Sequence, residues 1–449
     1  MIKKTVLLKN LAFILAAIFF NSCPEPQNGG SEDPAGLINI HSPADMAKIG
    51  VAETHPLSAK YLLANDVTLE NWTPIGDDTA PFTGVFNGNG KKITLNGFSD
   101  TALSEKTCLG IFGYVQGDSA SEKANIKNLT IHSAVNATGT TQAAGLVTGY
   151  AELAVIENIT LTGTFAYNST NVHYLGGVAG QINEEGTLVK NINSSLNMDI
   201  VPAGSSYIYV GGIAGIFQNG AGIENCHNAG NVTADNVASS AGGQVFAGGI
   251  AGGSNYAMSV NYHGYIIDSS FTGTVIGRSQ GNWTFVGGIA ATTVGGNVND
   301  NLATTRVERC FVTGTVSNQG DQSGFPYIGG VVAYNYYGSL VSQSYFSGTI
   351  NSGGTKNPYA CGGIAGYHSQ SSAPNNSRVE ECYSSGTANI NNGANVVGTT
   401  AGNALAPVRC YTITGPQPQA YYEGWDFTGV WIMGADGYPE LKWQNKEFL

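Results

Sequence analysis

Two short patterns of apolar and polar residues recur along the chain. The first is a glycine block, a pair of glycines between apolar residues, which occurs as LGGVAG (175–180), VGGIAG (210–215), AGGIAG (247–252), VGGIAA (286–291), IGGVVA (328–333) and CGGIAG (361–366). The first glycines of successive blocks are 35, 37, 39, 42 and 33 residues apart. Weaker copies stand at Gly110, Gly145 and Gly398. A period of this length is typical of proteins that stack similar structural units.

The second pattern follows each glycine block and predicts a strand. Its copies are IKNLTIHSAV (126–135), IENITLTGTF (156–165), VKNINSSLNM (189–198), IENCHNAGNV (223–232), IIDSSFTGTV (266–275), VERCFVTGTV (307–316), VSQSYFSGTI (341–350) and VEECYSSGTA (379–388). The first, fourth, sixth and tenth positions are mostly apolar or small, the second is often charged and the eighth is usually glycine. Apolar residues at alternate positions indicate a strand with one buried face, and the glycine marks a bend.

A unit of two or three short strands cannot bury its apolar face alone, so neighbouring units must share one core. Strands joined by connections of this length pair in parallel, about 4.8 Å from one coil to the next. We therefore predict an all-β fold, a right-handed parallel β-helix of about ten coils. A β-sandwich and a β-propeller are the alternatives, although a propeller would need four strands per blade and a longer repeat.

Both ends of such a stack need a cover, because exposed strand edges recruit other chains. Ser42, Pro43 and Asp45 form a typical helix start, with proline at the first helical position, and predict a short capping helix that ends near Gly50. Four bulky rings near the other end are expected to form the opposite cap: Trp425, Trp431, Tyr438 and Trp443.

The composition agrees with this fold and excludes others. Glycine supplies 62 of 449 residues and charged residues only 11%, which excludes a helical bundle. A hydrophobic content of 42% is too high for a disordered chain. The formal net charge of −12 argues against nucleic acid as a partner, because nucleic acid demands basic patches.

The N-terminus has the order of a secretory signal, with Lys3, Lys4 and Lys9 before an apolar run that ends at Phe20. The run is too short to span a bilayer. Asn21 and Ser22 then precede Cys23, as at the lipidation site of bacterial lipoproteins. We predict a lipoprotein signal peptide (1–22), a lipid anchor on Cys23 that holds the protein to the outer membrane at the cell surface, a flexible tether (23–36), and one β-helix domain (37–449). An ordinary signal peptide with an incidental cysteine is the alternative.

The glycine blocks and the I-E-N-C-x-x-x-G-x-V segments together resemble the GLUG-motif repeats of bacterial surface proteins. The segments YLLANDVTLENWTPIG (61–76) and WDFTGVW (425–431) add to that resemblance, which covers nearly the whole mature chain. The resemblance implies a right-handed, β-helix-like stalk of the kind found in adhesins and beside the peptidase domain of some immunoglobulin A-cleaving metalloproteases. It implies no catalytic residues.

The chain contains none of the common catalytic or cofactor motifs. No histidine is followed by glutamate, so H-E-x-x-H is absent, and there is no phosphate-binding loop and no C-x-x-C pair. We expect no catalytic residues, no cofactor and no metal site. The enzyme alternative is a polysaccharide lyase or glycosidase, which would need a base beside a cation or paired carboxylates. The acids of the repeat (Glu157, Glu224, Glu308 and Glu380) alternate along the rod with Lys127 and Lys190, as on a solvated face.

Four cysteines share the fourth, inward position of the second pattern: Cys226, Cys310, Cys382 and Cys410. Other repeats carry leucine, isoleucine or serine there, so the column is expected to be a packing column. Among the four, Cys382 and Cys410 fall on adjacent turns, at a spacing that a disulfide tolerates, and they are a candidate disulfide.

Two groups of aromatic residues are candidate binding surfaces. Phe311, Tyr345, Tyr383 and Tyr411 follow the cysteine column and should point outward on consecutive turns, where they could stack on a sugar chain or only on one another. Tyr334, Tyr336, Tyr337 and Tyr367, together with Tyr256, follow the glycine blocks in expected loops. We expect a non-catalytic binding or adhesion module for a glycan or a host or matrix protein. The alternatives are a polysaccharide-active enzyme and a purely structural spacer.

Overall fold

The computed structural model describes residues 36–445 except 170–172, 203–206, 237–242, 255–262, 281–282, 296–304, 321–324, 354–357, 371–376, 391–392 and 394. The chain divides into two units, Met1–Gly36 and Leu37–Leu449. The predicted signal peptide, the predicted lipid anchor on Cys23 and the predicted tether up to residue 35 lie outside the described residues, as does Tyr256. The elements below all belong to the second unit.

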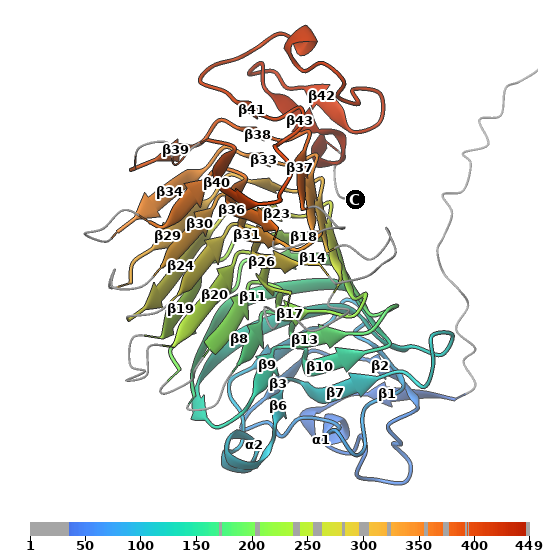
Figure 1. The fold of residues 1–449 in the computed structure, drawn as a ribbon. Helices are drawn as coiled ribbons and strands as arrows, with labels where there is room; N and C mark the ends of the chain where they lie inside the picture. The colour runs from blue at the N-terminus through green and yellow to red at the C-terminus, as the bar shows by residue number, and fades with distance from the viewer. Residues whose placement is uncertain are drawn as a thin grey trace, which may run out of the picture. The chain divides into compact units, whose positions relative to one another are not determined.

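Three sheets of parallel strands run along this unit (Figure 1). Sheet 1 contains β1 (Leu37–Ile40), β2 (Lys60–Leu63), β3 (Val67–Leu69), β4 (Val85–Asn87), β5 (Lys92–Leu95), β8 (Ala124–Gly139), β11 (Ala154–Ser169), β14 (Leu188–Ser194), β15 (Asn197–Ile200), β18 (Gly222–Asn228), β19 (Val232–Asn236), β22 (Tyr265–Ile267), β23 (Ser270–Phe271), β24 (Thr274–Ser279), β27 (Arg306–Glu308), β28 (Phe311–Val312), β29 (Thr315–Asn318), β32 (Leu340–Ser342), β33 (Tyr345–Phe346), β34 (Thr349–Ser352), β37 (Arg378–Glu380), β38 (Tyr383–Ser384), β39 (Thr387–Ala388) and β41 (Tyr411–Thr412).

Sheet 2 contains β7 (Phe112–Gln116), β10 (Thr148–Glu152), β13 (Ala179–Asn183), β17 (Ala214–Phe217), β21 (Ala251–Gly253), β26 (Ala290–Val294), β31 (Val332–Tyr336), β36 (Ala365–Gln370) and β40 (Val397–Gly402). Sheet 3 contains β6 (Cys108–Leu109), β9 (Ala143–Gly145), β12 (Tyr174–Gly176), β16 (Tyr207–Gly211), β20 (Gln244–Gly248), β25 (Thr284–Gly287), β30 (Pro326–Gly329) and β35 (Ala360–Gly362).

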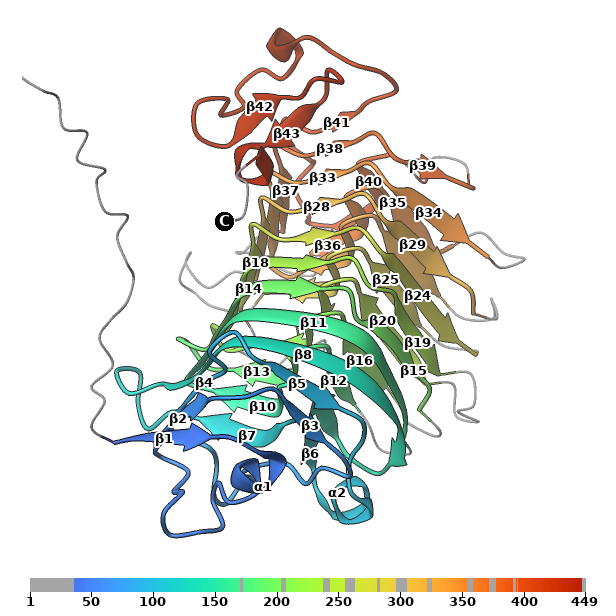
Figure 2. The ribbon, with the colours of Figure 1, turned by 180° about the vertical axis from the view of Figure 1, so that it is seen from behind.

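Each coil passes from sheet 3 to sheet 2, then to sheet 1, and the next coil repeats this path one rung further on (Figure 2). The strands pair in parallel and in register, so that Ile156 lies opposite Ile126 on one side and Val189 on the other. The predicted β-helical solenoid is therefore confirmed, and the sandwich and propeller alternatives are excluded. The nine strands of sheet 2 in the described part of the chain agree with the prediction of about ten coils. The hand of the spiral stays a prediction.

The paired glycines form the sharp corner between sheets 3 and 2. The second glycine of each block stacks on its equivalent in the next coil, so that a Cβ atom on Gly249 would overlap the carbonyl oxygen of Gly288, and one on Gly288 that of Gly330. Glycine recurs at this corner because the coils approach too closely for any side chain.

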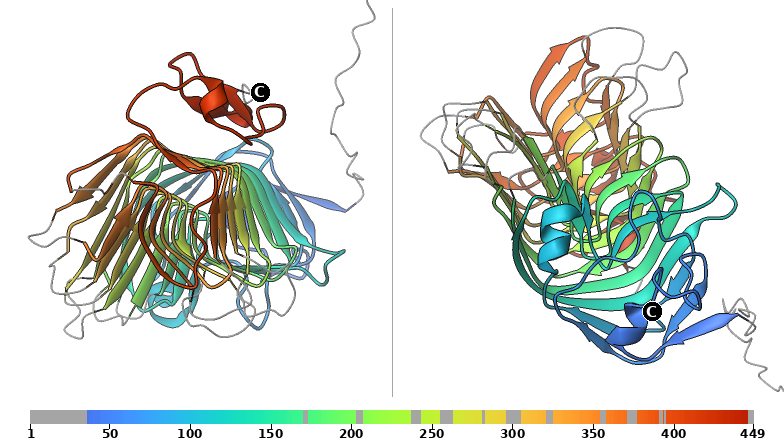
Figure 3. Two further views of the ribbon diagram at one scale, coloured as in Figure 1. Left: turned by 45° about the horizontal axis from the view of Figure 1, so that its top comes forward. Right: turned by 90° about the horizontal axis from the view of Figure 1, so that it is seen from below.

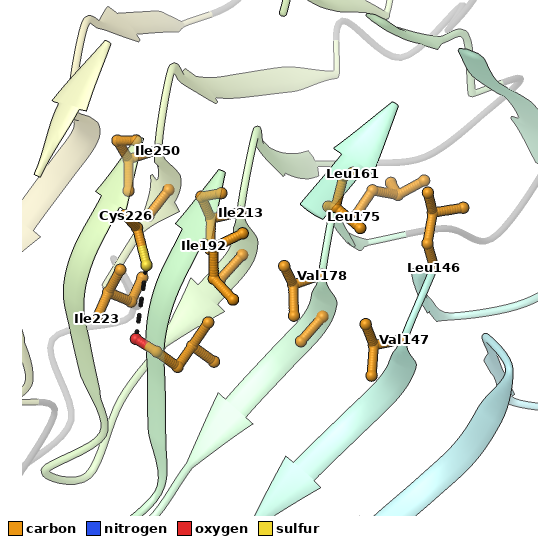
Figure 4. Close-up of a cluster of buried hydrophobic side chains, with 14 of the residues drawn as sticks. Leu146, Val147, Leu161, Leu175, Val178, Ile192, Ile213, Ile223, Cys226 and Ile250 are labelled. Atoms are coloured by element: carbon orange, nitrogen blue, oxygen red, sulfur yellow. Dashed lines mark hydrogen bonds between the residues drawn. The ribbon is translucent and has the colours of Figure 1, made fainter. Parts of the chain in front are cut away.

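The core lies between the three sheets and consists of columns that repeat from coil to coil (Figure 4). One column contains the fourth position of the second pattern, and its members are Leu129, Ile159, Ile192, Cys226, Ser269, Cys310, Ser344 and Cys382, all buried. The register connects Leu129, Ile159, Ile192 and Cys226 directly. Ser269 then accepts a hydrogen bond of 3.1 Å from the Cys226 amide, and Ser344 one of 3.0 Å from the Cys310 amide. These residues form the single interior file that a β-helix requires.

A second column has no equivalent in the sequence analysis. The third position of the second pattern has a positive φ in coil after coil and bends sheet 1: Asn128, Asn158, Asn191, Asn225, Asp268, Arg309, Gln343, Glu381 and Arg409. Asparagine tolerates this conformation best among residues with a side chain. In the later coils charged pairs hold the column, as in the contact of 2.7 Å between Arg309 Nε and Asp268 Oδ1.

Two short helices lie at the N-terminal end of the stack (Figure 1). The predicted capping helix is α1 (Pro43–Met46), whose Ser42 hydroxyl accepts a hydrogen bond of 3.2 Å from the Asp45 amide. It is shorter than expected and continues as turns to Gly50. The second helix, α2 (Asp100–Glu105), was not predicted; Ser99 caps it, and it packs against β8.

At the other end the chain leaves the coils. It forms a short 3₁₀ helix (Gln419–Tyr421), an antiparallel hairpin of β42 (Trp431–Met433) and β43 (Pro439–Leu441), and a final 3₁₀ turn (Lys442–Asn445). Figure 3 shows the hairpin outside the coils, on the side of sheet 1. We call the segment from 413 to 445 the C-terminal cap.

Candidate functional site

The first predicted group of rings forms a continuous ladder on the outer face of sheet 1. Phe311, Tyr345, Tyr383 and Tyr411 lie opposite one another in successive coils. The rings of Phe311 and Tyr345 stack at 5.2 Å with 7° between their planes, and those of Tyr345 and Tyr383 at 5.0 Å with 6°. The side chains point away from the core, as alternation along the strand requires.

This ladder does not face solvent, because the C-terminal cap covers it. Trp431 lies 6.5 Å from Tyr345 and 6.2 Å from Tyr383, and Trp443 lies 5.4 Å from Phe311, measured between ring centroids. Tyr345 and Tyr383 are only 5% and 2% exposed. Of the two alternatives for this column, the geometry favours rings that stack on one another, and the rings predicted for the cap bury Tyr345 and Tyr383. A ligand-binding role for the column stays a prediction. Phe311 and Tyr411, at the two ends of the ladder, are half-buried.

The second predicted group belongs to a larger cluster at the glycine corner, on the outer side of sheets 3 and 2. From sheet 3 it contains Tyr174, Tyr209, Phe246, Phe285 and Tyr327, which pair in register along the sheet. The ring centroids of Tyr209 and Phe246 lie 4.2 Å apart, and those of Phe246 and Phe285 as well as of Phe285 and Tyr327 lie 4.8 Å apart.

Across the corner, sheet 2 carries a second column, in which Gly253, Thr292, Tyr334 and Tyr367 lie opposite one another in successive coils. The ring centroid of Tyr334 lies 5.6 Å from those of Phe285 and Tyr327. The column of sheet 3 ends with the small Ala360, and Tyr367 lies 5.5 Å from Tyr327. The corner is therefore filled by close packing of the chain itself.

The four predicted residues of this group differ in exposure. Tyr334 and Tyr336 are buried within the cluster, and Tyr334 stacks on Tyr367 at 5.3 Å with 4° between the ring planes. Tyr367 and Tyr337 are half-buried. Tyr337 also has a positive φ of 55°, which is unusual for a bulky residue. The same turn at the end of other sheet 2 strands gives Leu153 and Glu184 a positive φ, so the coil geometry imposes it.

Two exposed rings beside this cluster were missed. Phe325 and Tyr359 are 48% and 51% exposed, and their ring centroids lie 5.4 Å apart. Tyr359 lies 5.9 Å from Tyr367, which connects the pair to the cluster. We call Phe325, Tyr359 and Tyr367 the aromatic rim. A sequence signal exists for Phe325, because an aromatic-x-aromatic pattern precedes three glycine blocks, at 207–209, 283–285 and 325–327, but Tyr359 lies outside this pattern.

The buried cysteines lie in a nonreactive environment. Burial raises the pKa of the Cys226 thiol to about 12 and also raises that of Cys310. Burial raises the pKa of Cys382 as well, and the thiol of Cys410 beside it raises it further. Both Cys382 and Cys410 are free thiols in the structure, so the disulfide between them stays a prediction.

The glutamates of the repeat contact cations or a phenol. Glu157 pairs with Lys190 at 3.1 Å, and Glu380 with Arg378 at 3.4 Å. Glu308 pairs with Arg306 at 3.4 Å, and Glu224 accepts a hydrogen bond of 3.0 Å from the Tyr265 hydroxyl. Across the described residues, three or more His, Cys, Asp or Glu side chains do not gather as a metal site would require. Neither α1 nor α2 in the described range is long and apolar enough to cross a membrane.

A known sequence motif matches one coil of the chain. The GLUG motif matches residues 326–351, which run from β30 through β34. A crystal structure named "putative immunoglobulin A1 protease" from Bacteroides ovatus is similar over 91% of this chain and 92% of that chain, with 15% sequence identity and a TM-score of 0.35. No curated protein matches the chain in sequence. The protein therefore carries the GLUG motif, in one complete coil of its solenoid.

Proposed function

We propose that this protein is a non-catalytic binding protein of the bacterial cell envelope, held at the outer membrane by a lipid on Cys23. Its solenoid presents the aromatic rim to a glycan, or to a host or matrix protein. The observation that carries the proposal is the exposure of Phe325 and Tyr359, 48% and 51%, beside a corner where the other rings of the cluster are buried or half-buried.

Exposed aromatic rings that lie together are a common feature of contact surfaces. Phe325, Tyr359 and Tyr367 offer flat apolar faces, which suit the C–H faces of a pyranose, and a phenol hydroxyl that can bond to sugar hydroxyls. A glycan is for this reason the favoured ligand class, and a host or matrix protein is the other outcome of the test.

The absence of catalysis is part of this proposal. The four glutamates that recur along sheet 1 each contact a cation or a phenol, as described above, which is typical of a row of surface ion pairs. Asp77 is similarly engaged, because Lys106 Nζ lies 2.9 Å from its carboxylate and holds its pKa well below the ordinary value. Each of these contacts pairs a carboxylate with a cation or a hydroxyl group, whereas glycoside hydrolysis needs two carboxyl groups that flank the bond to be cleaved.

The binding role is tested with the double variant Phe325→Ala/Tyr359→Ala in the mature chain. Binding to a glycan array and to a panel of matrix proteins should fall at least tenfold, while the melting temperature stays unchanged because both rings are exposed. Tyr421→Ala, which removes a ring that is 43% exposed in the C-terminal cap, is the matched control. Equal binding by the double variant and the parent would contradict the proposal, and so would products released from a polysaccharide digest.

The anchor is tested separately. Cells that express the full chain should incorporate a labelled fatty acid into it, and Cys23→Ser should abolish the label and release the protein from the membrane fraction. Labelling that persists in Cys23→Ser would refute the anchor at this residue. Protease treatment of intact cells would then show whether the protein lies on the outer surface.

A further inference from the structure

A polar groove lies on the outer face of sheet 1, away from the glycine corner. We define it by two short columns, Asn158, Asn191 and Asn225 at the bend and Thr160, Asn193 and His227 beside them. Thr160, Asn193 and His227 lie opposite one another in β11, β14 and β18. Two adjoining hollows of about 450 and 270 Å³ share these three residues. The groove therefore runs along the stack, across successive coils.

The asparagines at the bend form a ladder of hydrogen bonds. Asn191 donates to Asn158 at 2.9 Å and Asn225 donates to Asn191 at 2.8 Å, each through Nδ2 and to Oδ1. A carboxamide has two N–H donors, so each of these amides keeps one donor beyond the ladder. The side chains of Thr160 and Asn193 are exposed, and neither has a hydrogen-bond partner among the described residues. The groove thus offers a regular set of donors and acceptors.

Among the described residues that line the two hollows, none is charged at neutral pH. The neighbouring outward column, which contains Glu157 and Lys190, is charged, but its charges pair with each other. The chain as a whole has a formal net charge of −12, which repels anionic ligands. A polyuronate or another acidic polymer is therefore disfavoured, and a neutral ligand rich in hydroxyl groups fits.

The C-terminal cap closes one end of the groove. The indole of Trp443 stacks on the imidazole of His227, with 5.3 Å between ring centroids and 25° between planes. Both ring nitrogens of His227 are engaged, Nδ1 with the Ser270 hydroxyl at 2.9 Å and Nε2 with Asn225 Oδ1 at 3.1 Å. Burial lowers the pKa of His227 to about 4, with Asp268 acting weakly in the other direction, so the ring is neutral near pH 7.

The outward column itself changes character where the cap begins. Thr160 and Asn193 are exposed, His227 lies beside Trp443 of the cap, and after Ser270 the following coils carry the ring ladder that the cap buries. Under the cap this column consists of rings that pack. Over the hollows it carries a hydroxyl and an amide, which can form hydrogen bonds with a ligand. The rung spacing of about 4.8 Å is also close to the length of one pyranose unit.

From these observations we infer that the polar groove binds a neutral oligosaccharide, whose chain lies along the stack and whose end meets His227 and Trp443. Hydroxyl groups of successive sugar units bond to Thr160, Asn193 and the free amide donors of the ladder. This site is separate from the aromatic rim and does not depend on the function proposed for it.

The inference is tested by calorimetric titration of the mature protein with cellohexaose, mannohexaose, xylohexaose and hexagalacturonate. At least one neutral hexasaccharide should bind, and Thr160→Val/Asn193→Ala should weaken it at least tenfold. The variant should keep its circular dichroism spectrum and melting temperature, because both side chains are exposed. Thr349→Val/Thr387→Val, in a distant part of the same sheet, is the matched control and should bind like the parent.

Three outcomes would overturn the inference: no neutral hexasaccharide binds, hexagalacturonate binds best, or the groove variant binds as tightly as the parent. Loss of binding only in Phe325→Ala/Tyr359→Ala would place the sugar on the aromatic rim, which supports the proposed function and refutes the groove. Loss only in the groove variant would do the reverse. A change in tryptophan fluorescence on titration that Trp443→Phe abolishes would further support contact at the closed end.

Discussion

The hydroxyl of Tyr383 donates a hydrogen bond of 2.7 Å to the carbonyl oxygen of Pro439. It joins the ring ladder of sheet 1 to the hairpin of the C-terminal cap. Gln444 makes a similar contact through Nε2 with the Tyr345 hydroxyl at 2.8 Å. The hairpin of the cap is therefore attached to the coils by side chains, since its two strands pair with each other.

Because those side-chain contacts carry the cap, Trp431→Ala should loosen it. Trp431 is completely buried against Tyr345 and Tyr383, and truncation of such a residue costs about 3–5 kcal/mol. We expect a lower melting temperature for the C-terminal coils and new binding of a hydrophobic dye. Ile432→Ala is the control, because the neighbouring residue on the same strand is 41% exposed. Similar effects of both substitutions would contradict this account.

Gly288→Ala should destabilise the solenoid strongly. A methyl group there would overlap the carbonyl oxygen of Gly330 and the side chain of Val312, and overpacking of this kind costs about 1–3 kcal/mol or more. Gly97→Ala is the matched control, since nothing lies within 4 Å of a Cβ at that position. Urea denaturation followed by circular dichroism measures the difference, and equal midpoints would show that the corner tolerates side chains.

Stability should decrease as the pH falls below about 6.5. Burial lowers the pKa of His227 to about 4 and also lowers that of His368, whose Nε2 lies 3.0 Å from the carbonyl oxygen of Leu405. The unfolded chain therefore takes up protons first, and each histidine costs stability between its unfolded and its folded pKa, by about 1.4 kcal/mol per unit of difference.

Melting temperatures measured from pH 8 to pH 4.5 test this dependence. The slope below pH 6.5 should become smaller in His227→Asn and His368→Asn, and smaller still when the two are combined. An unchanged slope in the double variant would assign the acid sensitivity to other groups.

Thiol labelling should distinguish Cys410 from the other described cysteines. Cys108, Cys226, Cys310, Cys361 and Cys382 are buried, whereas Cys410 is partly exposed. In the folded reduced protein, iodoacetamide should modify Cys410 first and the other five only on unfolding. Cys410→Ser should remove the fast label. If the predicted Cys382–Cys410 disulfide forms in the secreted protein, the fast label appears only after reduction, which mass spectrometry detects.

The columns of this fold were predictable because the coils stack in register. Equivalent positions of successive repeats therefore lie directly above one another. Cys226, Cys310 and Cys382 could be placed inside, and the ring ladder outside, from their positions in the repeat alone. The bend column was harder to recognise, since only four of its members are asparagines, and the later coils use Asp268, Arg309 and Glu381.

The exposure of the ring ladder could not be predicted in the same way, because it depends on the C-terminal cap, which does not contain the repeat. Trp443 donates a hydrogen bond of 3.0 Å to the carbonyl oxygen of Arg309, far away in the sequence, and no periodicity specifies that contact. The sequence therefore predicted that the ring column points outward, but left open whether it binds a ligand or only stacks, and the cap covers Tyr345 and Tyr383. Phe325 and Tyr359 lie just before the glycine-block strands, outside the positions that the repeat marks as regular.

The glycine corner also determines how the length of the solenoid can change. Insertion or deletion of one complete coil would again place a glycine pair against the carbonyl oxygens of the neighbouring coil, and the strands would pair as before. A fraction of a turn would put a bulky residue at the corner and break it. The length of the solenoid can thus change during evolution by whole coils, whereas its loops can change by single residues.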